Sequence, residues 1–273
     1  MKVTFQINNK NYTSDLSNAF DISIPLIFKG PQPNTYDVET ATARTYEAGE
    51  FIGDTRRGGG CNFEEYRLIP HCNGTHTECV GHISLERISV SNTLKSSFIP
   101  STLLTVTPEA AANTEDVYIP AKNTEDLIIT KKCLKDKIDT TDKNFHNALI
   151  IRTLPNDDTK RSRRYMENFP PFFSVDAMKY IAELGTEHLL IDIPSVDRTF
   201  DEGKLTAHHI FWNVREGSHD VDKHIHSMKT ITEMIYAADE ITDGCYIANI
   251  QIPNFDSDAA PSRVLIYKIE AHL

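Results

Sequence analysis

Three histidines, two cysteines and a glutamate lie within fourteen residues, in the stretch PHCNGTHTECVGHI from Pro70 to Ile83. Imidazole, thiolate and carboxylate groups are the ligands that hold Zn²⁺ and similar divalent ions in proteins. Side chains alternate between two faces along a strand, so residues separated by an even number share a face. A strand here would place four donors on one face, and these are Cys72, His76, Glu78 and His82. His71 and Cys79 would lie on the opposite face.

The spacing of these donors favours a metal site that is not a zinc finger. A structural zinc finger takes two ligand pairs at regular spacing, commonly CxxC, and CxxC occurs nowhere in the chain. Asn73 and Gly74 are also a hairpin-turn pair, which would interrupt the alternation and bring His71 to the metal side. We prefer Cys72 to His71 as a ligand and keep His71 as the alternative.

Length and composition predict a single domain over residues 1–273. The chain is 40% hydrophobic and 25% charged, which is ordinary for a globular protein. Its net charge of −11 argues against nucleic acid as a partner, since that contact needs clustered Lys and Arg. Neither a membrane span nor a signal peptide is indicated. Five cysteines, an odd number, do not indicate a disulfide framework, so we expect a cytoplasmic protein.

Strands and helices alternate along the chain, which predicts the α/β or α+β class. β-rich apolar runs predict strands within 62–70, 96–108, 147–155 and 187–196. Ser174 is a good N-cap for a helix that ends at Gly185. A second helix is expected from about Ser227 to Asp243, with Glu233 on the face away from its apolar stripe. The basic cluster KRSRRYM at 160–166 is interpreted as a solvated loop without a ligand.

The His-rich stretch resembles HxGTHxDxPxH, the signature of the metal-dependent cyclase family of hydrolases, which includes kynurenine formamidase and isatin hydrolase. When the GTH triplets are aligned, the first His of the signature falls on Cys72, the Asp on Glu78 and the last His on His82. Two ligand positions are therefore changed in type. Cysteine and glutamate are both still donors that bind Zn²⁺.

The resemblance extends almost from end to end of the chain. DISIPL at 21–26 is similar to the family's DLSxPL opening, NALIIRT and FPPFFSVDAMKYIAELG match its central strand and helix, and IDIPSVD at 191–197 matches its GxDxxSxD region. AHHIFW at 207–212 is similar to AHxxLL, which implies a metal-binding histidine at His208. ITEMIYAADEI is similar to IENLxNLxxL, which implies a metal-binding carboxylate at Glu233. His219, His224 and His226 are expected in a solvated loop.

The fold that the resemblance implies is α/β, a swivelling β/β/α core around a mixed sheet with an N-terminal arm. Residues 1–45 would form the arm and a loop that covers the pocket. In the family this arm often crosses to a partner subunit, which implies a homodimer or homotetramer. Phe28 and Tyr36 in the covering loop suit a ring-bearing small-molecule substrate, and no membrane partner is expected.

The activity that the resemblance implies is metal-dependent hydrolysis of a C–N amide bond, in an N-formyl arylamine or a cyclic amide. A divalent ion lowers the pKa of bound water to about 7 and polarises a carbonyl oxygen, so a metal-activated water would be the nucleophile. One or two ions, Zn²⁺ before Mn²⁺, would be held by Cys72, His76, Glu78, His82, His208 and Glu233.

A general base and supporting carboxylates are also expected near the metal. Glu78 and His209 are the candidates for the general base. Asp192 and Asp197 are expected to brace a strand end or to hydrogen-bond a ligating imidazole. The alternative functions are lactone hydrolysis or dehydration on the same metal scaffold, and metal binding without catalysis.

Overall fold

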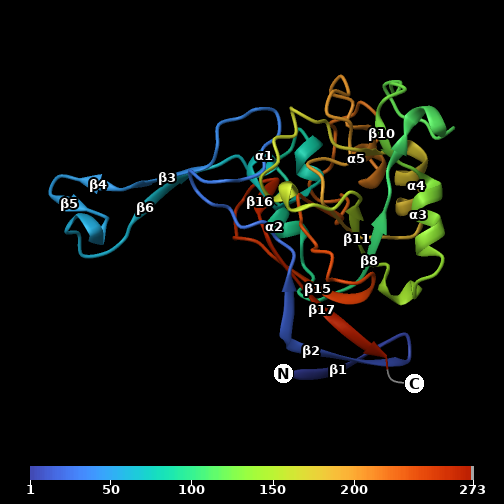
Figure 1. Ribbon diagram of the computed structural model, residues 1–273, viewed down its shortest axis with the longest axis horizontal. Coiled ribbons are helices and arrows are strands. Elements are labelled where there is room, and N and C mark those ends of the chain that lie inside the picture. The colour runs from blue at the N-terminus through green and yellow to red at the C-terminus, as the bar shows by residue number, and fades with distance from the viewer. Residues whose placement is uncertain (272–273) are drawn as a thin grey trace.

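A ten-stranded mixed sheet forms the body of the protein in the computed structural model, which describes residues 1–271 (Figure 1). The strand order is β1-β2-β17-β15-β8-β11-β13-β14-β7-β16. The four central strands run parallel, and these are β8 (Ile99–Val106), β11 (Ala148–Thr153), β13 (His188–Ile191) and β14 (Thr230–Glu233). The outer strands pair antiparallel: β1 (Lys2–Ile7), β2 (Lys10–Asp21), β17 (Arg263–Ala271) and β15 (Gly244–Gln251) on one side, and β7 (His76–Cys79) and β16 (Ala259–Pro261) on the other. The predicted mixed α/β class is confirmed.

The predicted apolar runs form the centre of this sheet. Every side chain of β11 is buried, as expected for a parallel strand that is covered on both faces. Leu149 and Ile151 pack into the larger hydrophobic core, and Ala148 and Ile150 pack into the second core on the opposite face. This alternation is the two-residue period of a strand.

Helices α3 (Lys131–Ile138) and α4 (Val175–Glu183) cover the sheet at the side of the larger core (Figure 1). The predicted start of α4 is confirmed, because the Ser174 hydroxyl accepts a hydrogen bond from the amide of Ala177 at 2.8 Å. Gly185 follows with a φ of +77°, as its predicted role as terminator requires. The shorter helices are α1 (Pro70–Asn73), α2 (Val90–Thr93) and α5 (Thr206–Phe211).

The helix expected from Ser227 to Asp243 is wrong, and so is the helical position of Glu233. This segment contributes β14, which inserts between β13 and β7. Thr230, Ile231 and Thr232 are β-branched, and such residues fit a buried strand better than a helix. Neighbours on both sides satisfy the backbone of β14, so the sheet outweighs the helical spacing of the apolar residues.

The continuous strand expected over the His-rich stretch is also wrong. Only His76–Cys79 is extended, as β7. Before it, Pro70–Asn73 makes the single turn of α1, and after it Val80–Ile83 is a 3₁₀ turn. The even-number rule therefore applies to His76 and Glu78 alone, and the turn expected from Asn73 and Gly74 does interrupt the alternation.

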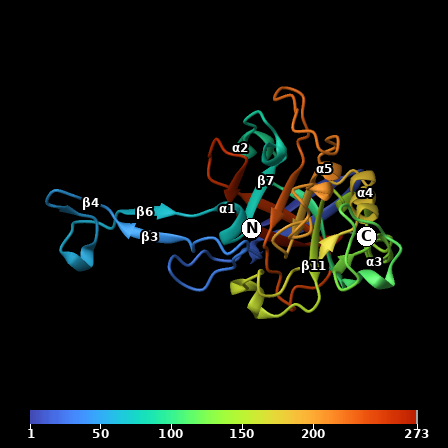
Figure 2. The same ribbon diagram turned by 90° about the horizontal axis from the view of Figure 1, so that it is seen from above.

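An arm projects from the body on the side away from α3 and α4 (Figures 1 and 2). It consists of two small antiparallel pairs, β3 (Thr42–Thr45) with β6 (Glu64–Arg67) and β4 (Glu47–Ala48) with β5 (Phe51–Ile52). The predicted arm segment, residues 1–45, supplies β1 and β2 to the sheet edge and then leads into β3. A third small sheet joins β9 (Glu109–Ala110), β10 (Leu127–Ile129) and β12 (Phe172–Phe173).

The cysteines and the lengths of the helices also bear on the predictions. All five cysteines are free, as expected from their number. In residues 1–271 no helix has the length and apolar character needed to cross a membrane.

Candidate metal centre

The centre is built on β7, which lies between β14 and β16. The antiparallel register places His76 directly opposite Glu233. The side chains of two directly opposite residues lie next to each other on the same face of the sheet. His76 Nε2 lies 3.4 Å from Glu233 Oε2. Glu78 is two residues further along β7, so it projects from the same face. Glu78 and Glu233 are 1% and 3% exposed, so the sheet buries two carboxylates side by side.

Helix α5 brings His208 to this face of the sheet. Ala207 and Phe211 anchor the helix in the larger core, and His208 Nε2 lies 2.9 Å from Glu78 Oε1. Asp197 anchors the first turn of this helix, because its carboxylate accepts hydrogen bonds from the amides of Ala207 and His208 at 2.7 and 3.1 Å. The same carboxylate lies 2.6 Å from His208 Nδ1. The predicted bracing role of Asp197 is thus observed.

Hydrogen bonds fix which ring nitrogen of each histidine faces the carboxylates. A carbonyl oxygen only accepts, so His76 Nδ1 donates to Gly74 O at 3.0 Å and leaves Nε2 directed at Glu233. Among the described residues, His76 Nε2 and Glu78 Oε2 are buried and make no hydrogen bond of good geometry, although Glu233 Oε2 lies 3.4 Å from the first and His71 Nδ1 lies 3.1 Å from the second. Buried polar atoms are normally satisfied, so the placement of these two atoms fits a site for a cation.

His71, His82 and Asp258 complete the cluster from its more open side. His71 Nδ1 lies 3.1 Å from Glu78 Oε2, and His71 Nε2 lies 2.9 Å from Asp258 Oδ2. His82 Nδ1 lies 3.5 Å from Asp258 Oδ2 and 3.9 Å from Glu78 Oε2. Three groups therefore have donors close enough to share an ion: His71 with His76 and Glu78, Glu78 with His82 and His208, and His71 with His82 and Asp258.

The pKa shifts show how the cluster balances its charge. Burial raises the pKa of Glu78, but His82 and His208 outweigh it and hold this pKa well below its usual range. Burial and the nearby Glu78 raise the pKa of Glu233. Burial lowers the pKa of His208, yet Glu78 and Asp197 raise it well above its ordinary value. The buried carboxylates and the histidines around them are therefore complementary in charge.

The same balance applies to His71. Burial lowers its pKa, but the neighbouring carboxylates of Asp258 and Glu78 outweigh burial and raise the pKa to about 10. A divalent cation supplies the same positive charge and accepts the lone pairs that these protons occupy. The donor set of imidazoles and carboxylates therefore fits a divalent metal ion.

Two further predicted residues, Cys72 and His209, lie outside the three donor groups. Cys72 is buried on α1 and, like Glu233, belongs to none of the three donor groups, although Glu233 Oε2 lies 3.4 Å from His76 Nε2. Burial and the charge of Glu233 raise the pKa of its thiol to about 11. His209 is buried with its ring centroid 6.2 Å from that of His219, outside the donor groups, and its role as a base stays a prediction.

Asp258 is the residue that sequence reasoning missed. It directly precedes β16, and no motif marks it.

 Its separation in sequence from His71, with which it pairs, is 187 residues. The pairing of β16 with β7 brings the two together, because Ala259 lies opposite Glu78. Only the strand order could have revealed this neighbour.

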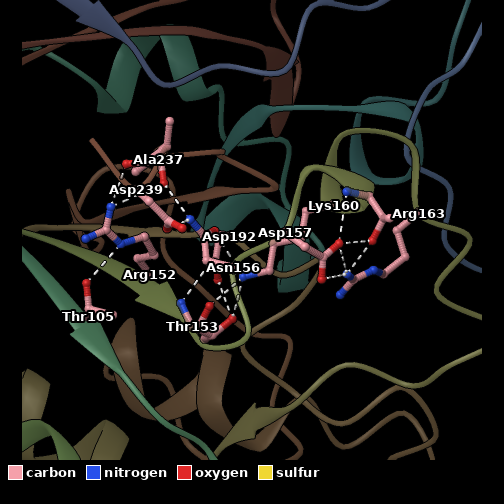
Figure 3. Close-up of polar contacts among 12 residues, drawn as sticks. Thr105, Arg152, Thr153, Asn156, Asp157, Lys160, Arg163, Asp192, Ala237 and Asp239 are labelled. Atoms are coloured by element: carbon pink, nitrogen blue, oxygen red, sulfur yellow. Dashed lines mark hydrogen bonds and ion pairs between the residues drawn. The ribbon is translucent and has the colours of Figure 1, made fainter. Parts of the chain in front are cut away.

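The basic cluster at 160–166 differs from its prediction at two residues, Lys160 and Tyr165, which are both buried. Lys160 is buried, and its ammonium donates to Asp192 Oδ2 at 2.7 Å and to Thr153 O at 2.6 Å (Figure 3). The expectation of a wholly solvated loop is therefore wrong for Lys160 and for Tyr165. Asp192 also accepts the amide and hydroxyl of Thr153, so it braces the ends of β11 and β13, as predicted.

These observations define a class of protein with a mixed α/β fold and a buried cluster of histidines and carboxylates. The Cyclase family model matches residues 14–198, more than half of the chain, so the chain belongs to the Cyclase family. The predicted family is confirmed. No curated protein matches the sequence.

Solved structures share this fold at low sequence identity. One is a predicted metal-dependent hydrolase from Bacillus stearothermophilus, with a TM-score of 0.56 and 18% identity, covering 92% of this chain and 98% of that one. An isatin hydrolase bound to the product analogue thioisatinate has a TM-score of 0.56 and 12% identity, covering 93% of each chain. A novel cyclase has a TM-score of 0.58 and 12% identity, covering 93% of this chain and 90% of that one.

Proposed function

We propose that this chain is a metal-dependent hydrolase that cleaves a C–N amide bond, in an N-formyl arylamine or a cyclic amide. The observation that carries the proposal is the convergence of histidine nitrogens on the buried carboxylates of Glu78 and Glu233. Membership of the Cyclase family and the likeness to an isatin hydrolase support this chemistry.

The proposed ligands are His76, Glu78, His82, His208 and Glu233, with one further donor from α1. Glu78 Oε1 faces His208 and Glu78 Oε2 faces His71, so this carboxylate has the geometry to join two ions. A bound divalent ion, Zn²⁺ or Mn²⁺, would supply an activated water and polarise the substrate carbonyl. The low pKa of Glu78 suits a charged ligand better than a general base.

Residues beside the centre suit a substrate with a ring. The Tyr36 hydroxyl donates to Thr199 O at 3.4 Å. Burial and the charges of Glu233 and Asp201 raise the pKa of Tyr36 to about 12, so its hydroxyl remains a donor. A cavity of about 590 Å³ is lined by Arg198 and Thr199, which follow Asp197 in the chain, and by the exposed rings of Phe169 and Phe200, while none of the proposed ligands lines it. Phe28, by contrast, stacks on Tyr66 of the arm at 4.7 Å.

The test uses purified protein stripped of metal and reloaded with Zn²⁺ or Mn²⁺. We expect one or two bound equivalents and metal-dependent hydrolysis of some member of a panel of N-formyl arylamines and cyclic amides. Glu78→Gln replaces a proposed ligand with a group of the same shape. It should lose both metal and turnover because an amide is a weaker ligand. Turnover of lactones without turnover of amides would overturn the proposed amide cleavage in favour of lactone hydrolysis. Bound metal without any turnover would overturn the proposal that the chain is a hydrolase.

Two further properties belong to this proposal. We propose a homodimer or homotetramer, since the projecting arm exposes aromatic rings that a second subunit would cover. We also propose a cytoplasmic location, which is consistent with five free cysteines. Ultracentrifugation of the purified chain tests the first property, and fractionation of the source cells tests the second.

A further inference from the structure

We propose that His71, held by Asp258, supplies the metal ligand that the signature alignment assigns to Cys72. The inference rests on the proposed metal site. It assigns a role to Asp258, which lies outside the signature, and it places the thiol of Cys72 outside the coordination sphere.

The turn of α1 permits only one of these two neighbours to face Glu78. Consecutive residues on a helix project about 100° apart. The turn is fixed at both ends, because the amides of Cys72 and Asn73 donate to Ile69 O at 3.0 and 3.1 Å. The Asn73 side chain accepts the amide of Ile69 at 2.7 Å. This closed turn directs His71 toward Glu78.

The hydrogen bond to Asp258 determines which nitrogen of His71 is free. A carboxylate only accepts, so His71 Nε2 donates to Asp258 Oδ2 at 2.9 Å. A neutral ring then carries its lone pair on Nδ1, which lies 3.1 Å from Glu78 Oε2. His71 thus forms one of the donor groups with His76 and Glu78.

The backbone around Asp258 holds its carboxylate in place. Asp258 O accepts the amide of Cys79 on β7 at 3.0 Å, and Ser257 O accepts the amide of Val90 at 2.8 Å. Gly81 allows the close approach, since a Cβ there would lie 2.1 Å from Ile88 O and 3.1 Å from Asp258 Cβ. The backbone of Asp258 is therefore part of the fold of the centre, and its carboxylate, 39% exposed, is held by His71.

The arrangement repeats the one at His208. There Asp197 lies 2.6 Å from Nδ1, and Nε2 lies 2.9 Å from Glu78 Oε1. Glu78 therefore lies between two histidines, each with an outer carboxylate on its other nitrogen. Carboxylates in this position fix the ring orientation and raise the basicity of a ligating imidazole.

The test measures metal binding without substrate, so it does not depend on turnover. The protein is stripped and titrated with Co²⁺ and Zn²⁺, and metal content is read by elemental analysis. We expect Cys72→Ser to keep the full content, and we expect wild-type protein to show no thiolate-to-cobalt charge-transfer absorption. His71→Ala should lose affinity at one site, and Asp258→Ala should weaken that site about 10- to 100-fold.

Asp256→Ala is the matched control for Asp258→Ala, since Asp256 is exposed in the same segment and uses only its backbone carbonyl, toward Arg87. It should bind metal as the wild type does. Circular dichroism of each stripped variant checks the fold, and Asp258→Ala keeps the test valid if His71→Ala fails to fold. A charge-transfer band that disappears in Cys72→Ser, or full affinity in Asp258→Ala, would overturn the inference. Intact binding without turnover would instead count against the proposed hydrolase.

Discussion

Each of three histidines in the centre is oriented by the hydrogen bond on the far side of its ring. His76 uses the carbonyl of Gly74, His208 uses Asp197, and His71 uses Asp258. The nitrogens that remain face Glu78 or Glu233. Because an imidazole lone pair and a carboxylate repel one another, this geometry requires a proton or a cation between them.

Asp197→Asn tests this orientation at His208. We expect about a 10- to 100-fold loss of metal affinity, because the amide is a weaker acceptor for His208 Nδ1. Competition with a chelating dye measures the affinity. Tyr118→Phe is the control and should change affinity less, since it keeps the Asp197 carboxylate and removes a hydroxyl that donates to Asp197 Oδ1 at 2.6 Å and accepts the amide of Arg198 at 3.0 Å. Equal affinity in Asp197→Asn and wild type would show that Asp197 serves α5 alone.

At the scale of the elements, a buried ion pair joins the ends of two parallel strands beside the centre. Lys160 and Asp192 are both almost fully buried, and Thr153 at the end of β11 bonds to each of them (Figure 3). Burial raises the pKa of Asp192 even though Lys160 opposes the shift. Asp192 begins the segment that leads from β13 to Asp197, so the pair positions that segment.

Lys160→Met should lower the free energy of unfolding by about 3–5 kcal/mol, because it leaves the buried Asp192 carboxylate without its partner. The double variant Lys160→Met with Asp192→Asn should recover part of this loss. Denaturant unfolding measures both values. Lys179→Met, on the exposed side of α4, is the control and should change stability little. Additive losses in the double variant would contradict a coupled pair.

His188, at the start of β13, makes the stability of the sheet depend on pH. Burial lowers its pKa from 6.5 to about 4, so the folded protein keeps this ring neutral. The unfolded chain binds the proton more readily between these values. The contribution is therefore fully present above about pH 6.5 and is lost as the pH falls through about 4.

His188→Gln should flatten the fall in stability over this window by up to about 3 kcal/mol. Urea unfolding at several pH values between 4 and 7 measures the slope in both proteins. His224→Gln, in the exposed loop, is the control and should leave the slope unchanged. A wild-type slope that persists in His188→Gln would assign the acid sensitivity to other groups.

At the scale of the whole molecule, the arm is the part that the body does not support. Tyr46, Phe51 and Phe63 pack on one another near its end, and each stays more than two-fifths exposed. A short two-stranded hairpin is marginally stable in water, so an arm of this kind gains from a covering surface. The proposed second subunit would supply that surface.

Replacing residues 46–63 with a short Gly-Ser linker should convert the oligomer to a smaller species while metal content is kept. Sedimentation velocity reports the size, and elemental analysis reports the metal. The triple variant Tyr46→Ser, Phe51→Ser and Phe63→Ser keeps the backbone of the arm and should weaken association as well. A full-length chain that sediments as a monomer at micromolar concentration would contradict the proposed role of the arm.

The sequence by itself determined the local features whose causes lie within a few residues. Ser174 and Gly185 bound α4, the apolar runs became β8, β11 and β13, and the spacing of His76 and Glu78 set them on one face. The resemblance to the cyclase signature also gave the family. Each of these signals depends on short-range sterics, hydrogen bonding or a linear motif, so it can be read without the fold.

Only the tertiary structure decided which donors meet. The segment around Glu233 has helical spacing but becomes β14, because two neighbouring strands satisfy its backbone. Asp258 reaches His71 from 187 residues away through the pairing of β16 with β7. His71 and Cys72 are adjacent in sequence, and the closed turn of α1 selects between them. Strand order and long-range packing carry this information, and neither has a periodicity that the chain displays locally.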